Sequence, residues 1–230
     1  MASLMHAPIK HEPLLIIVAS PSGGGKTTLI EEVVKEFPDN FARCVTDTTR
    51  APREGEVDGV DYNFLYPDQF EAMVLHGEFL EHAQVYGHSY GTRRRSIQNP
   101  FDQGKHVFLA IDVQGHQTFR ELAKTEELIK KSFFSIFLLP SGIPVLRKRL
   151  ELRGKDSPEV IEKRLIQAKA EMARASEFDR IVFSGKKEKV KQDFLAAISQ
   201  ELLKRQRAQM PNGPRWIHPA HPELSVRSRC

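Results

Sequence analysis

The chain has 230 residues, of which 40% are hydrophobic and 28% are charged, which is typical of a globular protein and excludes the disordered and fibrous classes. Five of its arginines lie in residues 205–230, where Glu223 is the sole acidic residue. Residues 1–204 carry 29 basic and 29 acidic side chains. Because nucleic-acid binding needs an excess of positive charge, no nucleic-acid partner is expected.

The cysteine content and the hydrophobic runs indicate a cytoplasmic protein. Cys44 and Cys230 are too few for a disulfide framework, which favours a reducing compartment. The apolar run at 14–19 is too short for a signal peptide, and no other run approaches the length that spans a bilayer. We therefore expect no membrane contact, and the sequence leaves the oligomeric state open.

The first predicted strand, residues 14–19, follows a leader at 1–13 that we expect to be flexible. The strand is continuously apolar, as in a parallel sheet covered on both faces. A glycine-rich loop and the start of a helix come next, in the order of a phosphate-binding P-loop. The expected nucleotide-binding residues are Ser20, Pro21, Ser22, Gly23, Gly24, Gly25, Lys26, Thr27 and Thr28.

The chemistry of such a loop is electrostatic. Glycines allow several backbone N–H groups to point inward, and the following helix adds the positive end of its dipole. Lys26 would reach the β and γ phosphates, and the Thr27 hydroxyl would bind Mg²⁺. The strict pattern has glycine where this chain has Ser20, so a glycine-rich turn without a phosphate role is the alternative.

The rest of the chain alternates between strands and helices, which predicts an α/β fold with a parallel sheet flanked by helices. Residues 48–103 break this alternation, and we expect them to form an inserted lobe. Residues 205–230 are expected to be a basic, disordered tail with a Pro-rich stretch at 210–222. Strands are expected at 107–111, 133–139 and 181–183, and helices from the loop to Pro38 and at 114–131, 143–152, 158–175 and 187–206.

A second motif lies at residues 46–64. Arg50 and Arg53 flank Pro52, and two guanidinium groups at this spacing could form a rigid fork for a second phosphate group. A charged surface loop is the alternative from spacing alone.

The sequence resembles the guanylate kinases from about residue 14 to residue 204, but not at 1–13 or 205–230. The likeness rests on TTRAPREGEVDGVDYNF from Thr48, FLEHAQVYGHSYG from Phe79, IDVQG from Ile111 and RLELRGKDSPEVIEKRL from Arg149. The resemblance implies a P-loop NTPase-type parallel sheet with an inserted GMP-binding lobe at about 48–103 and a helical lid at about 153–164.

The resemblance also implies how the acceptor is bound. It assigns the GMP phosphate to Arg50, Arg53 and Tyr62, with Tyr90 beside them, and guanine to Thr46, Glu81, Thr92 and Asp112. Guanine presents two neighbouring N–H donors that a carboxylate accepts as a pair, whereas adenine does not. Glu81 is therefore the expected discriminator, and a solvated carboxylate at a strand end is its alternative.

The implied reaction is ATP + GMP → ADP + GDP, with ATP and GMP as small-molecule substrates and Mg²⁺ as cofactor. Lys26, Arg53, Arg153 and Arg164 are the expected catalytic residues, the last two from the lid, where surface arginines are the alternative. Because the GMP phosphate is largely ionised near neutral pH, no general base is required.

Three features depart from the family pattern, and two rival functions stay open. Ser20 replaces a glycine, Ala110 stands where an acidic residue is frequent, and Ser184-Gly185 replaces an Asn-Asp pair near the ATP base. The rivals are a non-catalytic guanylate-kinase-like interaction module and a P-loop kinase for another phosphorylated acceptor. A metal site from His218, His221 and Cys230 is not expected, because three such residues in a Pro-rich tail are usually coincidence.

Overall fold

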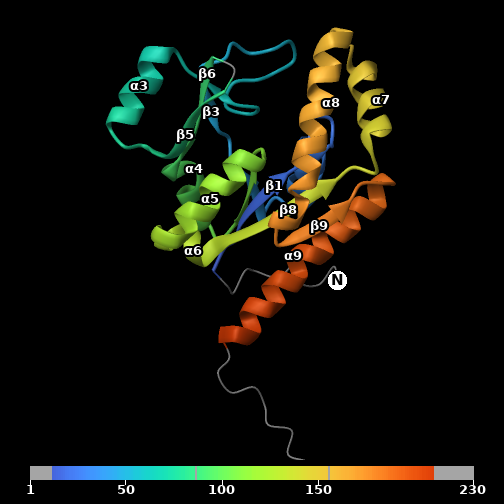
Figure 1. Cartoon of the computed structure of the whole chain (residues 1–230). Helices are drawn as coiled ribbons and strands as arrows, with labels where there is room; N and C mark the ends of the chain where they lie inside the picture. The colour runs from blue at the N-terminus through green and yellow to red at the C-terminus, as the bar shows by residue number, and fades with distance from the viewer. Residues whose placement is uncertain (1–11, 86, 155, 210–230) are drawn as a thin grey trace, which may run out of the picture.

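The computed structural model describes residues 12–85, 87–154 and 156–209, with the side chains of Val85 and Arg153 also outside the described part. A parallel five-stranded sheet forms its centre, in the order β2-β7-β1-β8-β9. Figure 1 shows β1 within this sheet and a smaller lobe standing to one side. The strands of the main sheet are β1 (Leu15–Ala19), β2 (Phe41–Arg43), β7 (His106–Ala110), β8 (Phe133–Leu139) and β9 (Arg180–Phe183).

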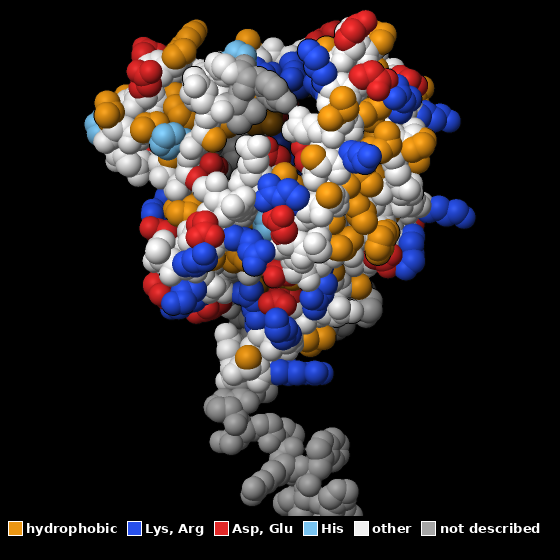
Figure 2. Space-filling model, in the orientation of Figure 1, with side chains coloured by type: hydrophobic (Ala, Val, Ile, Leu, Met, Phe, Trp, Pro, Cys, Tyr) orange, Lys and Arg blue, Asp and Glu red, His pale blue; other side chains and the backbone are white. Residues whose placement is uncertain are grey.

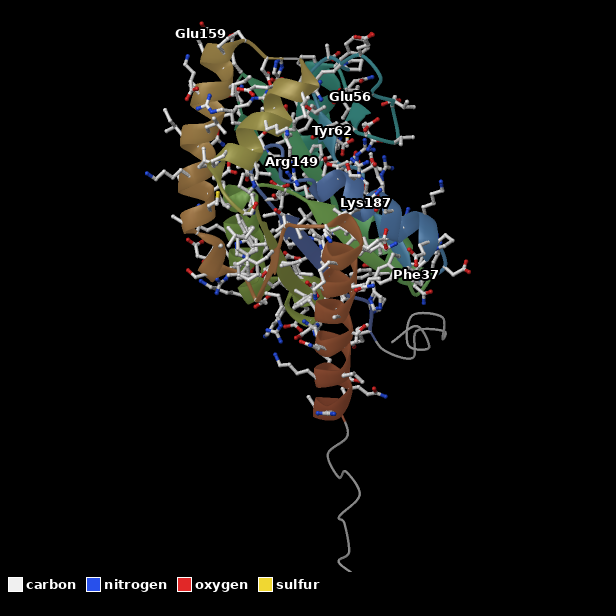
Figure 3. All side chains as sticks on the ribbon, turned by 90° about the vertical axis from the view of Figure 1, so that its right-hand side faces the viewer. Phe37, Glu56, Tyr62, Arg149, Glu159 and Lys187 are labelled. Carbon is white, nitrogen blue, oxygen red and sulfur yellow. The ribbon has the colours of Figure 1, made fainter. Side chains whose placement is uncertain are left out.

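Both faces of the main sheet are covered by helices, which is why its central strand β1 is apolar throughout. On one face, Ile16 and Val18 pack against α2 (Lys26–Glu36) and α9 (Lys187–Gln209). Lys187 bonds Glu32 at 2.5 Å where these two helices meet (Figure 3). On the other face, Leu15 and Ile17 pack against α4 (Arg94–Asp102), α5 (Val113–Thr125) and α6 (Glu127–Ser132).

The smaller lobe contains a second sheet in the order β4-β3-β6-β5, in which β3 and β4 are parallel and the other pairs antiparallel. The helix α3 (Pro67–Leu75) buries Phe70 against Phe79, whose ring centroid is 4.5 Å away. The strands are β3 (Asp47–Thr48), β4 (Asn63–Phe64), β5 (Phe79–Val85) and β6 (His88–Arg93).

A helical pair forms the third part, opposite the smaller lobe in Figure 1. It consists of α7 (Ile143–Arg153) and α8 (Pro158–Ala173), which pack through Leu146, Leu150, Ile161 and Leu165. Pro158 is the first residue of α8, where the sequence predicted the helix to begin, and Ser157 is its N-cap. Figure 3 places Glu159 at the tip of this pair.

Several predicted boundaries need correction. The predicted helix at 114–131 is two helices, because Glu126 is extended (φ −93°, ψ 108°), and this bend lets α6 direct Ile129 into the core. The three-residue strand β2 was missed, since so short a run has no periodicity. The helix α4, placed by its sequence in the inserted lobe, packs Ile97 into the core of the main sheet.

The predicted start of the basic tail at residue 205 is wrong, because α9 continues to Gln209. Arg205 donates to Glu201 at 2.8 Å and to the carbonyl oxygen of Phe133 at 2.6 Å, and these bonds extend the helix beyond the predicted end at 206. Residues 1–11, 210–222, His218, His221 and Cys230 lie outside the described part. Within the described part, no helix is both long and apolar enough to cross a membrane.

Candidate active site

The P-loop joins β1 to α2 at the carboxyl end of the central strand, between the smaller lobe and the helical pair. Gly23 (φ 83°) and Gly25 (φ 91°) have left-handed backbone conformations, which favour glycine. Gly25 is also the N-cap of α2, where no side chain bonds to the first turn. The loop therefore presents a helix N-terminus of the kind that binds phosphate groups.

Ser20 is buried beneath this loop. Its Oγ has no hydrogen-bond partner among the described residues. A Cβ at Gly24 would overlap this oxygen and would lie 2.9 Å from the carbonyl oxygen of Pro21. Ser20 therefore fills the space that a larger residue at position 24 would need.

Three cationic side chains donate to the loop itself. Lys26 Nζ lies 3.4 Å from the carbonyl oxygen of Ser20, and Arg164 lies 3.4 Å from the Ser22 hydroxyl. Arg149 of α7 donates to the carbonyl oxygen of Gly23 at 3.2 Å. Lys26 and Arg164 were predicted as site residues, whereas Arg149 was not assigned a role.

The sequence contained a signal for Arg149, because it begins the quoted lid motif and lies one helical turn before Arg153. The side chain of Arg153 lies outside the described part, although its backbone ends α7. Arg164 is also paired with Asp156 at 3.1 Å. The helical pair thus brings two arginines, Arg149 and Arg164, to the P-loop.

Thr27 and Thr28 lie in the first turn of α2 and have exposed side chains. A hydroxyl at this position, next to free helical N–H groups, fits a Mg²⁺ ion bound together with nucleotide phosphates. No group of three or more His, Cys, Asp or Glu side chains suited to a metal occurs in the described ranges.

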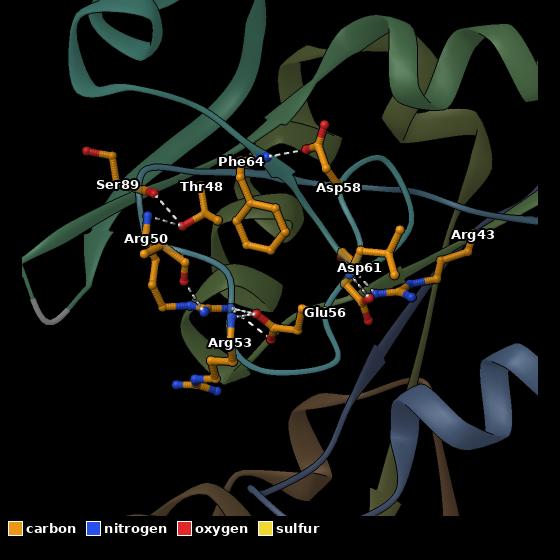
Figure 4. Close-up of polar contacts among 11 residues, drawn as sticks. Arg43, Thr48, Arg50, Arg53, Glu56, Asp58, Asp61, Phe64 and Ser89 are labelled. Carbon is orange, nitrogen blue, oxygen red and sulfur yellow. Dashed lines mark hydrogen bonds and ion pairs between the residues drawn. The ribbon is translucent and has the colours of Figure 1, made fainter.

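A second cluster lies in the smaller lobe around Arg50 (Figure 4). Its guanidinium donates to both carboxylate oxygens of Glu56, at 3.0 and 2.9 Å, and lies 5.4 Å from the centre of the Tyr62 ring. Tyr90 packs edge-on against Tyr62, with ring centroids 6.1 Å apart. The structure therefore brings together Arg50, Tyr62 and Tyr90, as the sequence predicted.

Two further residues of this loop, Glu56 and Arg53, differ from what the sequence predicted. The Glu56 carboxylate accepts the backbone N–H of Arg53 at 2.7 Å, so it organises the loop that carries both arginines. The Arg53 side chain is exposed, and Figure 4 shows its guanidinium directed away from the Arg50–Glu56 pair. No role was predicted for Glu56, although an acid six residues after Arg50 was a usable signal.

The third cluster centres on Glu81 of β5. Thr92 is its register partner on β6 and donates its hydroxyl to Glu81 Oε1 at 2.7 Å. Burial raises the pKa of Glu81, the Thr92 hydrogen bond opposes that shift, and the charge of Asp112 adds to it. Thr46 lies just before β3, where its carbonyl oxygen accepts from Asn63 at 2.9 Å.

Asp112 belongs to the main sheet rather than the lobe. It caps α5, because its Oδ1 accepts the backbone N–H groups of Gln114 at 3.0 Å and Gly115 at 2.8 Å. The negative charge of Asp112 acts on Glu81 in the smaller lobe and raises the pKa of that carboxyl. Figure 2 shows the molecular surface hollowed between the lobe and the helical pair.

Comparison with known proteins supports this arrangement. The family model described as guanylate kinase matches residues 12–201. A curated guanylate kinase of Thiobacillus denitrificans is 44% identical over 197 residues, which cover 84% of this chain and 89% of the relative. One of Idiomarina loihiensis is 40% identical over 201 residues, covering 86% and 89%. The chain belongs to the guanylate kinase family.

A solved structure agrees with the family assignment. The crystal structure of guanylate kinase from Anaplasma phagocytophilum is 26% identical, with a TM-score of 0.66, and the match covers 89% of this chain and 96% of that one. Membership of the family confirms the predicted α/β, P-loop NTPase-type fold. The individual roles of the site residues stay predictions.

Two of the residues that depart from the guanylate kinase pattern lie at the ends of strands of the main sheet. Ala110 ends β7 next to Val18 of β1 and supplies no carboxylate there. Ser184 follows β9 and donates its backbone N–H to the carbonyl oxygen of Leu139 at 2.8 Å. The backbone at both places is thus held by the main sheet, so each departure changes side-chain chemistry without changing the strand.

Proposed function

We propose that this chain transfers the γ-phosphoryl group of ATP to GMP, giving ADP and GDP. The observation that carries the proposal is the Glu81–Thr92 pair, which holds a half-buried carboxylate in the lobe that faces the P-loop. One carboxylate can accept the ring N–H and the exocyclic amine of guanine together. Adenine offers no such pair of donors, so this site distinguishes the two purines.

The acceptor phosphate would lie between the lobe and the P-loop. Arg50, with Tyr62 and Tyr90 against it, is the group we assign to its binding. Arg53 is exposed beside it and would contact the phosphate from the loop. A planar guanidinium matches phosphate oxygens bidentately, which fixes both the distance and the orientation of the acceptor.

The donor phosphates would be bound by the P-loop and by Lys26. Arg149 and Arg164 approach the same loop from the helical pair, and Arg153 lies on that pair. Positive charge around the transferring group spreads the charge that builds up on its oxygens. Because the GMP phosphate is already ionised near neutral pH, these residues position and neutralise, and none must remove a proton.

We assign Thr27 to Mg²⁺ bound with ATP, where the ion would neutralise phosphate charge. We also place the protein in the cytoplasm, on the strength of its cysteine content. Cys44 is buried and not disulfide-bonded, and burial raises the pKa of its thiol to about 12. A thiol so protected from ionisation is inert and has a packing role.

The two rival functions have less support. A non-catalytic interaction module has no use for Lys26 or for two arginines of the helical pair that bond to the P-loop. A kinase for a non-guanine acceptor leaves the buried Glu81 carboxylate without a ligand. Neither rival accounts for both clusters.

The test is an assay of ADP release with Mg-ATP and each of GMP, AMP, CMP and UMP. We expect turnover with GMP that is far above turnover with the other three. Arg53→Ala is expected to lower turnover with every acceptor, because it acts on the shared phosphate. Equal rates with AMP and GMP, or no turnover, would refute the proposal.

A further inference from the structure

A second pocket, of about 320 Å³, lies where the smaller lobe joins the main sheet. The chain passes between the two parts at residues 44–46, between β2 and β3, and at residues 93–94, between β6 and α4. Side chains from both crossings line this junction pocket. Its polar lining consists of Arg43, Asn63, Arg93, Arg95, Ser96 and Asn99.

The lining of the junction pocket is basic and contains no carboxylate. Arg93 is paired with the fully buried Asp47, its Nε donating at 2.6 Å. Arg43 donates to the carbonyl oxygen of Asp61 at 3.0 Å and lies 3.4 Å from Glu31, which is half exposed. Two of the three guanidinium groups are thus bonded to oxygen atoms of the protein.

Arg95 differs from these two. It lies in the first turn of α4, is exposed, and has no ion-pair or hydrogen-bond partner in the described part of the chain. The neighbouring Arg94 instead bonds Glu126 of α5–α6 at 3.0 Å. Arg95 therefore contributes a positive charge to the pocket that no protein group balances.

We propose that the junction pocket is a binding site for a small anion with a phosphate group. Guanidinium forks match phosphate oxygens, and the amides of Asn63 and Asn99 and the Ser96 hydroxyl offer further donors. The pocket volume is at the lower end of the range of about 300–1,000 Å³ for small-molecule sites. This fits inorganic phosphate or a small phosphomonoester rather than a nucleotide.

The junction pocket is separate from the proposed active site, but its residues are neighbours in the chain of residues assigned to that site. Arg93 follows Thr92, which bonds Glu81, and Asp47 follows Thr46 as the first residue of β3. An anion in the pocket would compete with Asp47 for Arg93. Occupancy therefore bears on β6, which carries Thr92, and on the start of β3, next to Thr46, without contact with either substrate.

The experiment follows arginine side-chain Nε resonances by NMR during titration with inorganic phosphate. The protein is first loaded with GMP and an unreactive ATP analogue, so that phosphate sites at the P-loop and lobe are filled. We expect a saturable shift of the Arg95 and Arg93 signals that sodium chloride of equal ionic strength does not reproduce. Glycerol phosphate is titrated in parallel, and whichever ligand binds more tightly identifies the source of the phosphate group.

Two variants make the test specific. Arg95→Gln should weaken phosphate binding by about tenfold or more, the loss of one charge-assisted contact. Arg94→Gln, on the same helix, should leave it unchanged, because that side chain bonds Glu126 outside the pocket. An equal loss in both variants, or a shift that chloride reproduces, would overturn the proposal. The readout does not depend on turnover, so it stands or fails separately from the proposed reaction.

Discussion

Thr92 donates its hydroxyl to Glu81 Oε1 across two paired strands, and this bond fixes a half-buried carboxylate in one orientation. A side chain held this way recognises a ligand with little loss of conformational entropy on binding. Because Thr92 is itself fully buried, the orientation of Glu81 is set by the lobe and not by solvent. Two predictions follow from this pair.

The first concerns base selectivity. Glu81→Gln removes the negative charge and places a donor opposite a guanine donor, so kcat/KM for GMP should fall by at least about tenfold, while the value for AMP changes little. Since burial raises the pKa of Glu81, ionised Glu81 costs stability at neutral pH, and the variant should unfold at an equal or higher denaturant concentration. Unchanged preference for GMP over AMP would remove Glu81 from this role.

The second concerns pH. Glu81 must be ionised to accept both guanine donors, and its pKa is raised above the ordinary 4.5. GMP affinity should therefore begin to fall on acidification at a pH above 4.5. Calorimetric titrations at several pH values check this. The GMP phosphate also titrates, near pH 6, so the comparison is with Glu81→Gln, whose profile should contain the phosphate effect alone.

The third prediction concerns the P-loop. Gly24→Ala should weaken binding of an unreactive ATP analogue, because its Cβ overlaps Ser20 Oγ and must displace the loop. Ser20→Gly removes that obstacle. The double variant Ser20→Gly/Gly24→Ala should therefore recover part of the lost affinity for the analogue, with a coupling energy of about 0.5–3 kcal/mol between the two positions. Additive effects in the double variant would mean that Ser20 does not limit position 24.

The fourth prediction concerns Glu56. This carboxylate fixes Arg50 and the backbone of Arg53, and both members of its ion pair with Arg50 are largely buried. Glu56→Gln should raise the KM for GMP several-fold and leave the KM for ATP unchanged. Glu54→Gln, an exposed change in the same loop, is the matched control. A rise in both KM values would indicate a general loss of structure instead.

The fifth prediction concerns His116, which is fully buried and stacked on Phe178 at 3.7 Å. Burial, with Arg120 and Arg174 nearby, lowers its pKa from 6.5 to about 4, while Glu177 and Asp179 oppose the shift. Between these values the unfolded chain binds the proton and the folded chain does not. The free energy of unfolding should thus fall by up to about 3 kcal/mol between pH 7 and pH 4.

Urea denaturation at both pH values measures this effect, with His116→Phe as the comparison. Phenylalanine preserves the stacking but cannot be protonated, so the variant should lose less stability on acidification. An equal loss in both proteins would assign the acid sensitivity to other groups.

The main sheet was predictable because Leu15–Ala19 is a continuous apolar run and Phe133–Leu139 is apolar except for Ser135. Tertiary packing reinforces this local signal. The short strands β2, β3 and β4 were not predictable, because two or three residues are too few to show an alternation of apolar and polar side chains. The sequence motifs identified most residues of the three site clusters. Partners such as Glu56 and Arg149 were missed because their contacts depend on how loop and helix pack, which spacing alone does not specify.

At Arg205, the boundary suggested by charge differs from the boundary of the fold. It was counted with the basic tail, yet its guanidinium donates to carbonyl oxygens of Lys131 and Phe133, where β8 begins. A shortened version of the protein that ends at residue 204 would have equal numbers of basic and acidic side chains. It would, however, leave those carbonyl oxygens to water and remove the end of α9. For expression and crystallisation, the safer boundary lies after Gln209.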